Sequence, residues 1–485
     1  MKIIPVDALW YKLECPVNVA NAIAEKYLKF ELPNSAFMPL VQAGITDGYV
    51  RFYKWKDGSL YIPRPLTQKM LDHMYQTGYL LKEPVRLPLH HAPIDKLELP
   101  KDLPFEPHDF QLQAVLDSLN NNNQINVMAT GSGKSFSIYL LVRHMLEKNI
   151  KTLLIVPNIS LLLQMQNDFA SYGWKFKKGD IKLIGGDYKD KSIGEKLTIS
   201  TWQSLVNYTS QLKDIGCVIE DECHRASSNS HINKILPFTG NAYYRFGFTG
   251  TLPQELCKKV GIYKNFGNPK TYITPRELID RGLATDIEIH PVFLKYPQAE
   301  IGAIWRSGRS DYKREVDYFC NHKTRTKIIT DLINTLSGNS LVLFDTLKQG
   351  DLLLEALQDN THFKVHVITG AISGKKREEI IQSSEASENN LILGSSKIMS
   401  TGINMKSLKN VLFVSGGKSY ISVNQSIGRV LRTHICKDKV YLYDFVDILK
   451  NGARENYMLK HYRERSKFYL EHGYTIIEKQ IDVSL

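Results

Sequence analysis

Residues 125–148 read INVMATGSGKSFSIYLLVRHMLEK: a strand-like apolar run, a loop with two glycines, and a long helix-like run. Glycines in such a loop let backbone N–H groups turn toward one anion, and the positive end of the following helix adds to the attraction. This order predicts a phosphate-binding loop in which Lys134 reaches the terminal phosphates of a nucleotide and Ser135 holds Mg²⁺. One position departs from the full pattern, which places a glycine where Met128 stands.

A second phosphate-site element follows the apolar run CVIE, which leads directly into Asp221, Glu222, Cys223 and His224. Two carboxylates at the end of a strand can divide the work of hydrolysis. One holds hydrated Mg²⁺ and the other orients the attacking water. We assign Asp221 to the metal and Glu222 to the water. Alone, an acidic pair is more typical of a solvated turn, but the lysine loop upstream favours a nucleotide site.

Two arginines near the end of the chain complete the expected site. In QSIGRVLR (425–432), Arg429 and Arg432 are three residues apart and so share one side of a helix. Such arginines can act as fingers that neutralise charge in the transition state of phosphoryl transfer. On an isolated helix they would more simply be exposed charges, so their role depends on the rest of the site.

Two long segments alternate apolar strands with helix-period stretches, a pattern typical of parallel sheets wrapped by helices. The strands expected in the first are NVMAT, TLLIVP, LTIST, GCVIED and YRFGFTGT; those in the second are SLVLFD, KVHVITG, NLILGSS, NVLFVSG and KVYLYDF. The sequence therefore predicts an α/β protein with two tandem parallel-sheet domains. We place their boundaries at 96–285 and 286–450, after a small α+β domain (1–95) and before a helical or extended tail (451–485).

The N-terminal segment contains its own hairpin signal, because YVRFYKWKDGSLYIP alternates around the turn Asp57-Gly58. Arg51, Lys54 and Trp55 lie on this hairpin, where cations and aromatic faces together suit phosphates and exposed bases. Strand aromatics are also common in protein cores. The hairpin is therefore a candidate DNA-binding surface, with a structural role as the alternative.

Composition sets broad limits on the function. Of 485 residues, 43% are hydrophobic and 23% charged, as in globular proteins, and the net charge of +12 is spread along the chain. The six cysteines are scattered, without zinc-ligand spacing, and no signal peptide or membrane-spanning run is visible. We expect a cytoplasmic protein without a structural metal, located in the host cytoplasm if a phage encodes it.

Taken in order, these motifs resemble those of the superfamily 2 helicases over roughly residues 104–450. ATGSGKS resembles motif I, DECH motif II, FTGT (248–251) motif III and QSIGRVLR motif VI, and weaker likenesses to motifs Ia, Ib, IV and V fall between them. The resemblance implies two RecA-like domains, with ATP and Mg²⁺ as cofactors. It also implies a nucleic-acid partner.

The resemblance also assigns further residues to roles. The nucleotide contacts that it implies are Phe110, Gln111, Thr130, Gly131, Ser132, Gly133, Lys134, Ser135, Gly402 and Gln425. The residues implied to couple ATP to movement are His224, Thr249 and Thr251. Those implied to contact the sugar-phosphate backbone are Pro157, Asn158, Thr201, Trp202, Thr369, Gly370 and Thr401. Ordinary strand-end and turn roles are the alternative for most of this last set.

Within the superfamily, the chain resembles the phage UvsW-like branch-migrating DNA helicases, through GITDGYVRFYKWKDGSLYIPRPL near its start and HYRERSKFYLEHGYTIIEK near its end. This predicts a DNA helicase or translocase for forked and junction DNA in recombination, repair or replication. An RNA helicase or a restriction-type motor shares the same core, and a non-translocating, ATP-switched clamp is a third reading. Protein partners, polarity and oligomeric state have no signal in the sequence.

Overall fold

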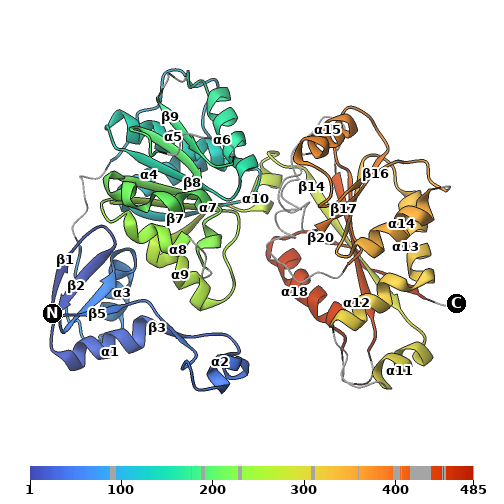
Figure 1. Cartoon of the computed structure of the whole chain (residues 1–485), viewed down its shortest axis with the longest axis horizontal. Helices are drawn as coiled ribbons and strands as arrows, with labels where there is room; N and C mark the ends of the chain where they lie inside the picture. The colour runs from blue at the N-terminus through green and yellow to red at the C-terminus, as the bar shows by residue number, and fades with distance from the viewer. Residues whose placement is uncertain are drawn as a thin grey trace. The chain divides into compact units, whose positions relative to one another are not determined.

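The computed structural model describes residues 1–87, 94–175, 177, 179–186, 192–227, 232–306, 312–358, 360–396, 405, 407–415, 439–450, 452 and 455–483. These residues form two compact units, one of Met1–Ala129 with Gly133–Ile273 and one of Thr130–Ser132 with Thr274–Leu485 (Figure 1). Each unit is described by itself below.

The first unit begins with a small α+β domain. Its antiparallel sheet has the order β1-β2-β6-β5 and is made of β1 (Lys2–Pro5), β2 (Trp10–Glu14), β5 (Lys54–Lys56) and β6 (Ser59–Pro63). Two helices, α1 (Val17–Tyr27) and α3 (Arg64–Gln76), pack on it around a core that includes Leu13, Ile23, Leu60 and Met74. A separate two-stranded ribbon pairs β3 (Lys29–Glu31) with β4 (Tyr49–Arg51), and the segment that connects the two strands contains α2 (Pro39–Gln42).

The hairpin predicted in this domain is present but shorter than its sequence pattern. Lys56 pairs with Ser59, and both turn residues have positive φ, 49° at Asp57 and 71° at Gly58, as a type I′ turn requires. The alternation expected from Tyr49 to Lys56 is wrong, because the chain leaves one sheet after Arg51 and enters another at Lys54. Patterning alone does not show such a change of sheet.

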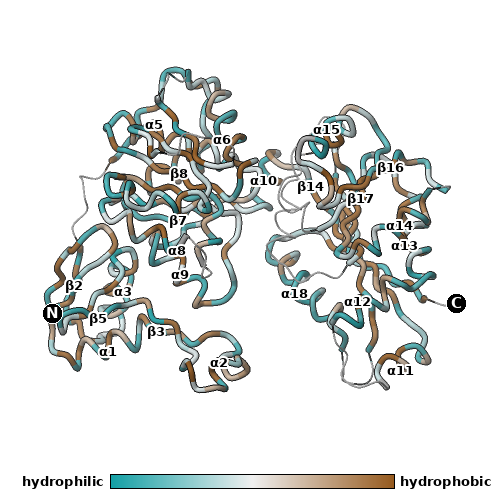
Figure 2. The backbone as a smooth tube through the Cα atoms, in the orientation of Figure 1, coloured by the Kyte–Doolittle hydropathy of each residue, from teal (hydrophilic) through white to brown (hydrophobic). Residues whose placement is uncertain are grey.

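The rest of the first unit is a parallel sheet of order β13-β7-β12-β11-β8-β10-β9. Its strands are β7 (Asn123–Met128), β8 (Thr152–Val156), β9 (Ile181–Ile184), β10 (Leu197–Thr201), β11 (Cys217–Asp221), β12 (Tyr244–Thr249) and β13 (Asn268–Ile273). Its longer helices are α4 (Asp109–Asn121), α5 (Lys134–Glu147), α6 (Ile159–Ser171) and α9 (Leu256–Phe266). The central strands are apolar and buried, and the outer helix faces are hydrophilic (Figure 2).

The second unit is another parallel sheet, of order β16-β17-β15-β18-β19-β14-β20, with β21 also paired to β14. Its strands are β14 (Asp286–Lys295), β15 (Ser340–Phe344), β16 (Lys364–Ile368), β17 (Asn390–Ser395), β18 (Asn410–Phe413), β19 (Lys439–Ile448), β20 (Thr475–Ile476) and β21 (Lys479–Asp482). Its helices include α10 (Pro275–Asp280), α11 (Gln298–Arg306), α12 (Tyr312–Asn321), α13 (Lys323–Thr335), α14 (Leu347–Leu357), α15 (Gly374–Glu385) and α18 (Tyr457–Glu471). The α/β class and the two tandem parallel sheets predicted from the sequence are thereby confirmed.

The predicted C-terminal tail and the proline-rich stretch before α4 are both attached to the domains beside them. Residues after 450 add strands β20 and β21 to the second sheet, and the rings of Phe468 and Tyr469 lie in its core. In the proline-rich stretch before α4, the Ile94 backbone exchanges two hydrogen bonds with the Asn120 side chain, at 2.7 and 2.9 Å. Asp102 in the same stretch pairs with Arg143 of α5. Both segments are thus held by side-chain contacts that sequence patterns do not reveal.

Candidate nucleotide site and nucleic-acid contacts

The predicted phosphate loop joins β7 to α5, and its backbone has the conformation that anion binding needs. Gly131 and Gly133 have φ of 88° and 78°, values that few L-residues adopt, so consecutive N–H groups can turn inward. The Lys134 ammonium donates to the Met128 carbonyl at 3.4 Å, and the Ser135 hydroxyl lies 2.7 Å from that of Tyr172. The loop, lysine and serine therefore have the composition and backbone that suit a nucleotide phosphate.

Gln111 lies directly against this loop. A Cβ atom at Gly133 would be 2.5 Å from the Gln111 Nε2, so only glycine fits beside that amide. The Gln111 Oε1 accepts a hydrogen bond from the His108 backbone at 2.9 Å, which caps the start of α4. Phe110 is buried, and its ring stacks on His108 at 5.3 Å. Gln111 thus caps the start of α4 and also lies against the phosphate loop, where the resemblance implies a nucleotide contact.

The acidic pair lies at the carboxyl end of β11, on the same edge of the sheet as the phosphate loop, with β12 between β11 and β7. Glu222 has φ of 55°, a left-handed conformation that is uncommon outside glycine and is often found at functional sites. Burial and the neighbouring Glu222 raise the pKa of Asp221, against the opposing effect of Lys134. A cation near Asp221 would relieve this repulsion, so the carboxylates fit Mg²⁺.

Behind the acidic pair, His224 connects motif II to motif III. Its Nδ1 lies 3.3 Å from Glu222 Oε2 and 3.0 Å from the Thr249 hydroxyl. Thr249 in turn donates to the Thr251 carbonyl at 2.7 Å and accepts from the Thr251 N–H at 3.2 Å. The three residues predicted to couple ATP to movement form one hydrogen-bonded chain with Glu222.

Sequence reasoning missed one ionisable residue next to this pair. Glu220 is buried within β11, and burial raises its pKa well above the usual range. Its Oε2 has no hydrogen-bond partner among the residues that the structure describes. The nearby Arg245 is also fully buried, and burial lowers its pKa to about 10. The only sequence signal for this arrangement was a glutamate inside the apolar run CVIE.

The residues predicted to contact the sugar-phosphate backbone lie at strand ends. This position is compatible with such a contact and also with an ordinary structural role. Asn158 follows β8 and caps α6 by accepting from Leu161 N at 2.9 Å. Thr201 ends β10, where its hydroxyl donates to Ser204 at 3.1 Å, and Trp202 packs against the domain core. Local structure thus accounts for these three positions, although a second role is compatible with their location.

The remaining predicted contacts fall on both units or beyond the described residues. In the second unit, Thr369 and Gly370 follow β16 in a turn closed by a hydrogen bond from Ile372 N to Thr369 O at 3.2 Å. Pro157 follows β8 in the first. Five predicted residues lie outside the described ranges: Thr401, Gly402, Gln425, Arg429 and Arg432.

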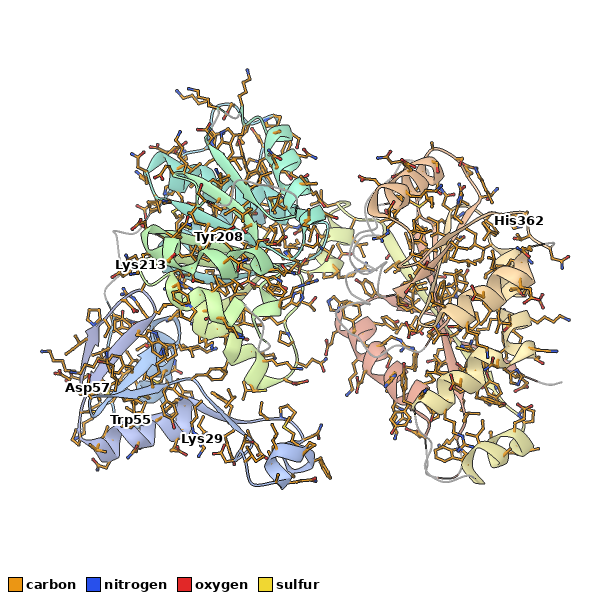
Figure 3. All side chains as sticks on the ribbon, in the orientation of Figure 1. Lys29, Trp55, Asp57, Tyr208, Lys213 and His362 are labelled. Atoms are coloured by element: carbon orange, nitrogen blue, oxygen red, sulfur yellow. The ribbon has the colours of Figure 1, made fainter. Side chains whose placement is uncertain are left out.

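The hairpin cations and aromatics of the N-terminal domain are surface features. Each of the three residues of β5 is exposed, and Trp55 lies near the Asp57 turn at the edge of this domain (Figure 3). Lys54 Nζ lies 4.2 Å from the centre of the Trp10 ring, while Arg51 already forms an ion pair with Asp47. Lys54 and Trp55 are therefore better placed than Arg51 to contact a ligand.

Comparison with known proteins adds the family. Residues 104–254 match the model for the type III restriction enzyme res subunit, and residues 324–434 match that for the helicase conserved C-terminal domain. The chain is 28% identical to the ATP-dependent DNA helicase uvsW of Enterobacteria phage T4, over 97% of both chains. These matches confirm the predicted resemblance to the UvsW-like helicases of superfamily 2. The chain is an ATP-dependent helicase enzyme, as its motifs predicted.

Solved structures support the fold. The type ISP restriction-modification enzyme LlaBIII bound to DNA matches with a TM-score of 0.61 and 15% identity, covering 78% of this chain and 32% of that one. Dbp5 of S. cerevisiae, bound to RNA, matches with a TM-score of 0.55 and 17% identity, covering 80% and 95%. Because one relative is bound to DNA and the other to RNA, this fold by itself does not choose the nucleic acid. Among the described residues, no helix is long and apolar enough to cross a bilayer.

Proposed function

We propose that this helicase uses ATP and Mg²⁺ to unwind or branch-migrate forked and junction DNA. The observation that carries the proposal is the convergence of Lys134 and the Asp221–Glu222 pair at one edge of the sheet, with His224 bonded to Thr249 behind them. The choice of DNA is supported by the uvsW relative, named as a DNA helicase, which is similar over nearly the full length of both chains.

The residues divide the hydrolysis between them. When bound, Mg²⁺ would neutralise charge on the phosphates, and ATP would supply the phosphate bond that is hydrolysed. The loop N–H groups and Lys134 bind and orient the phosphates, and Asp221 with Ser135 would hold the metal. Glu222 orients water and accepts its proton, while its contact with His224 links that state to Thr249.

The second domain completes the cycle in this proposal. Arg429 and Arg432, three residues apart in QSIGRVLR, would neutralise charge on the transferred phosphoryl group. Their alanine variants should bind ATP almost normally and hydrolyse it much more slowly, because such contacts act mostly on the transition state. A loss of ATP affinity with intact turnover at saturation would remove the finger assignment.

DNA would be held through many phosphates rather than through base edges. The net charge of +12 is spread along the chain, and the backbone-contact candidates follow strands of both sheets. Affinity for a single strand should then fall with salt, with a log–log slope of roughly −0.7 for each phosphate contacted. A nearly flat salt dependence would contradict this mode of binding.

One comparison of substrates tests the proposal. ATP turnover and strand separation are measured with single-stranded DNA, linear duplex, a fork, a four-way junction and RNA of matched length. We expect forks and junctions to stimulate turnover most and to be remodelled. Stronger stimulation by RNA would favour an RNA helicase. Turnover that does not depend on DNA length, without remodelling, would favour an ATP-switched clamp.

A further inference from the structure

The N-terminal domain is fastened to the helicase domain that follows it, along α9 and the turn before β12. The Ala8 N–H donates to the Gly240 carbonyl at 2.8 Å. The Arg64 guanidinium lies between two rings, 5.0 Å from the centre of Tyr11 and 4.8 Å from that of Tyr243. Helix α3 packs on α9, where α9 borders the N-terminal domain (Figure 1). These contacts form a seam between the two domains.

Two lysines, Lys54 and Lys264, lie at this seam. Lys264 of α9 is half-buried, with its ammonium 5.4 Å from the centre of the Phe52 ring. Phe52, whose ring the Lys264 ammonium approaches, comes two residues before Lys54 in the chain. In agreement with this placement, burial lowers the pKa of Lys264 and the charge of Lys54 lowers it further. Neither forms an ion pair with any residue in the described parts of the chain. Adjacent cations of this kind attract an anion.

The opposite face of α9 lies against motif II. Ile262 and Phe266 are fully buried in one core cluster with Cys223, the residue after the acidic pair. A Cβ atom at Gly247 of β12 would lie 2.7 Å from the Cys223 sulfur and 3.3 Å from the Phe266 ring. This packing leaves little room for α9 to move without also moving motif II.

We propose that Lys54 and Lys264 together bind a backbone phosphate of DNA at the seam, and that α9 connects this contact to motif II. Lys264 is then a DNA-binding residue of the motor domain and a positioning residue for Glu222 and His224. The inference rests on the proposed function, because it assumes that DNA is the substrate. A free phosphate ion offers the same chemistry as a backbone phosphodiester, and the experiment below distinguishes these two sources.

The test compares Lys264→Gln with a matched control on the same helix. Lys258 is exposed and already paired with Glu255 at 2.9 Å, so Lys258→Gln removes the same charge from α9 without touching the seam. Binding to a fork is measured over a salt series, and ATP turnover is measured with and without the fork. Lys264→Arg tests rescue by charge, and inorganic phosphate is titrated as a competitor.

We expect Lys264→Gln to bind the fork more weakly, with a log–log salt slope shallower by about 0.9, the value for one duplex phosphate. Thermal unfolding should match that of Lys258→Gln, while the ratio of fork-stimulated to DNA-free turnover falls and Lys264→Arg restores it. Lys54→Gln should reproduce the binding defect. Competition by inorganic phosphate at low concentration would instead identify a free-anion site and overturn the DNA assignment.

The other outcomes separate this inference from the proposed function. If Lys264→Gln behaves like Lys258→Gln while forks still stimulate the wild-type enzyme, the seam site is wrong and the proposed function stands. If forks do not stimulate ATP turnover of the wild-type enzyme or of the variants, the proposed function fails as well. A lower unfolding temperature with unchanged binding per folded molecule would reduce Lys264 to a packing residue and overturn the inference.

Discussion

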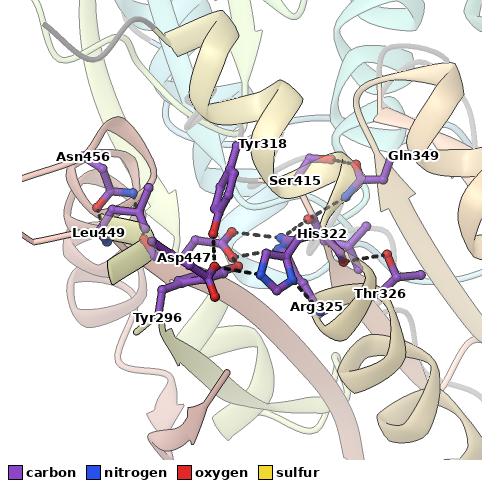
Figure 4. Close-up of polar contacts among 12 residues, drawn as sticks. Tyr296, Tyr318, His322, Arg325, Thr326, Gln349, Ser415, Asp447, Leu449 and Asn456 are labelled. Atoms are coloured by element: carbon purple, nitrogen blue, oxygen red, sulfur yellow. Dashed lines mark hydrogen bonds and ion pairs between the residues drawn. The ribbon is translucent and has the colours of Figure 1, made fainter. Parts of the chain in front are cut away.

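The two parallel sheets have related architectures but differ in how completely their buried charged groups are hydrogen-bonded. In the first, the buried Glu220 Oε2 and one nitrogen of the buried Arg245 lack a hydrogen-bond partner among the described residues, although Arg245 also donates to Thr239 and to the Asn265 carbonyl. In the second, Arg325 forms two hydrogen bonds to Asp447, at 2.7 and 2.9 Å, and a third to the Val414 carbonyl at 2.7 Å (Figure 4).

The second sheet repeats this complete pairing elsewhere. Arg465 of α18 donates to both oxygens of Asp444, at 2.8 and 2.9 Å, and the Tyr469 hydroxyl donates to the same carboxylate. Tyr296 adds a hydrogen bond to Asp447 at 2.6 Å. These networks attach helices α13 and α18 to β19. Buried charge is therefore structural in the second sheet, whereas in the first the buried Glu220 and Arg245 lie close to the acidic pair.

The largest expected effect is on catalysis in the first sheet. Glu222→Gln should lower ATP turnover by about 10²–10⁴-fold while ATP still binds, because the amide cannot accept the proton of the attacking water. Turnover and nucleotide affinity are measured separately, with Glu255→Gln as an exposed acidic control. Near-normal turnover would remove Glu222 from this role.

In the second sheet the largest effect should be on stability. Arg325→Met leaves Asp447 buried without its partner, which should lower the free energy of unfolding by about 3–5 kcal/mol. Denaturant unfolding gives this value, and Arg463→Met is the matched control because Arg463 is mostly exposed. Equal stability of the two variants would contradict the structural role of the buried pair.

A smaller effect should follow from breaking the link between motifs II and III. His224→Ala removes the bond to Thr249, and a hydrogen bond of about 0.5–1.5 kcal/mol corresponds to a roughly 2–10-fold loss. We expect this loss in strand separation per ATP hydrolysed, with nucleotide affinity retained. A double-mutant cycle with Thr249→Val checks it, since additive losses would mean that the two residues act independently.

The smallest effect sharpens the contrast between the sheets. Burial raises the pKa of Glu220 and so favours its neutral form, and Glu220→Gln replaces this acid by a neutral amide of similar shape. The free energy of unfolding should change by less than about 1 kcal/mol. A loss as large as that of Arg325→Met would show that Glu220 is a charged partner of Arg245, and the two sheets would then be alike.

Local patterns predicted most of the fold. Every strand expected in the two helicase domains is present, because a buried parallel strand must be a short apolar run whatever surrounds it. The Asp57-Gly58 turn was equally readable, since its two positive φ angles favour Asp-Gly. Patterns failed at Phe52, where the chain leaves one sheet for another, and after residue 450, where strands that looked like a tail joined β14.

By itself, the sequence determined the class of fold, the two tandem sheets and the resemblance to the helicases, and it predicted the phosphate loop and the acidic pair. These depend on neighbours along the chain, where spacing alone sets the geometry. Only the tertiary structure decided that Glu220 lies buried beside Arg245, that His224 joins Glu222 to Thr249, and that Lys54 and Lys264 meet at one seam. Those contacts join residues that are distant in sequence, and the burial and charge that give them meaning exist only once the sheets have packed.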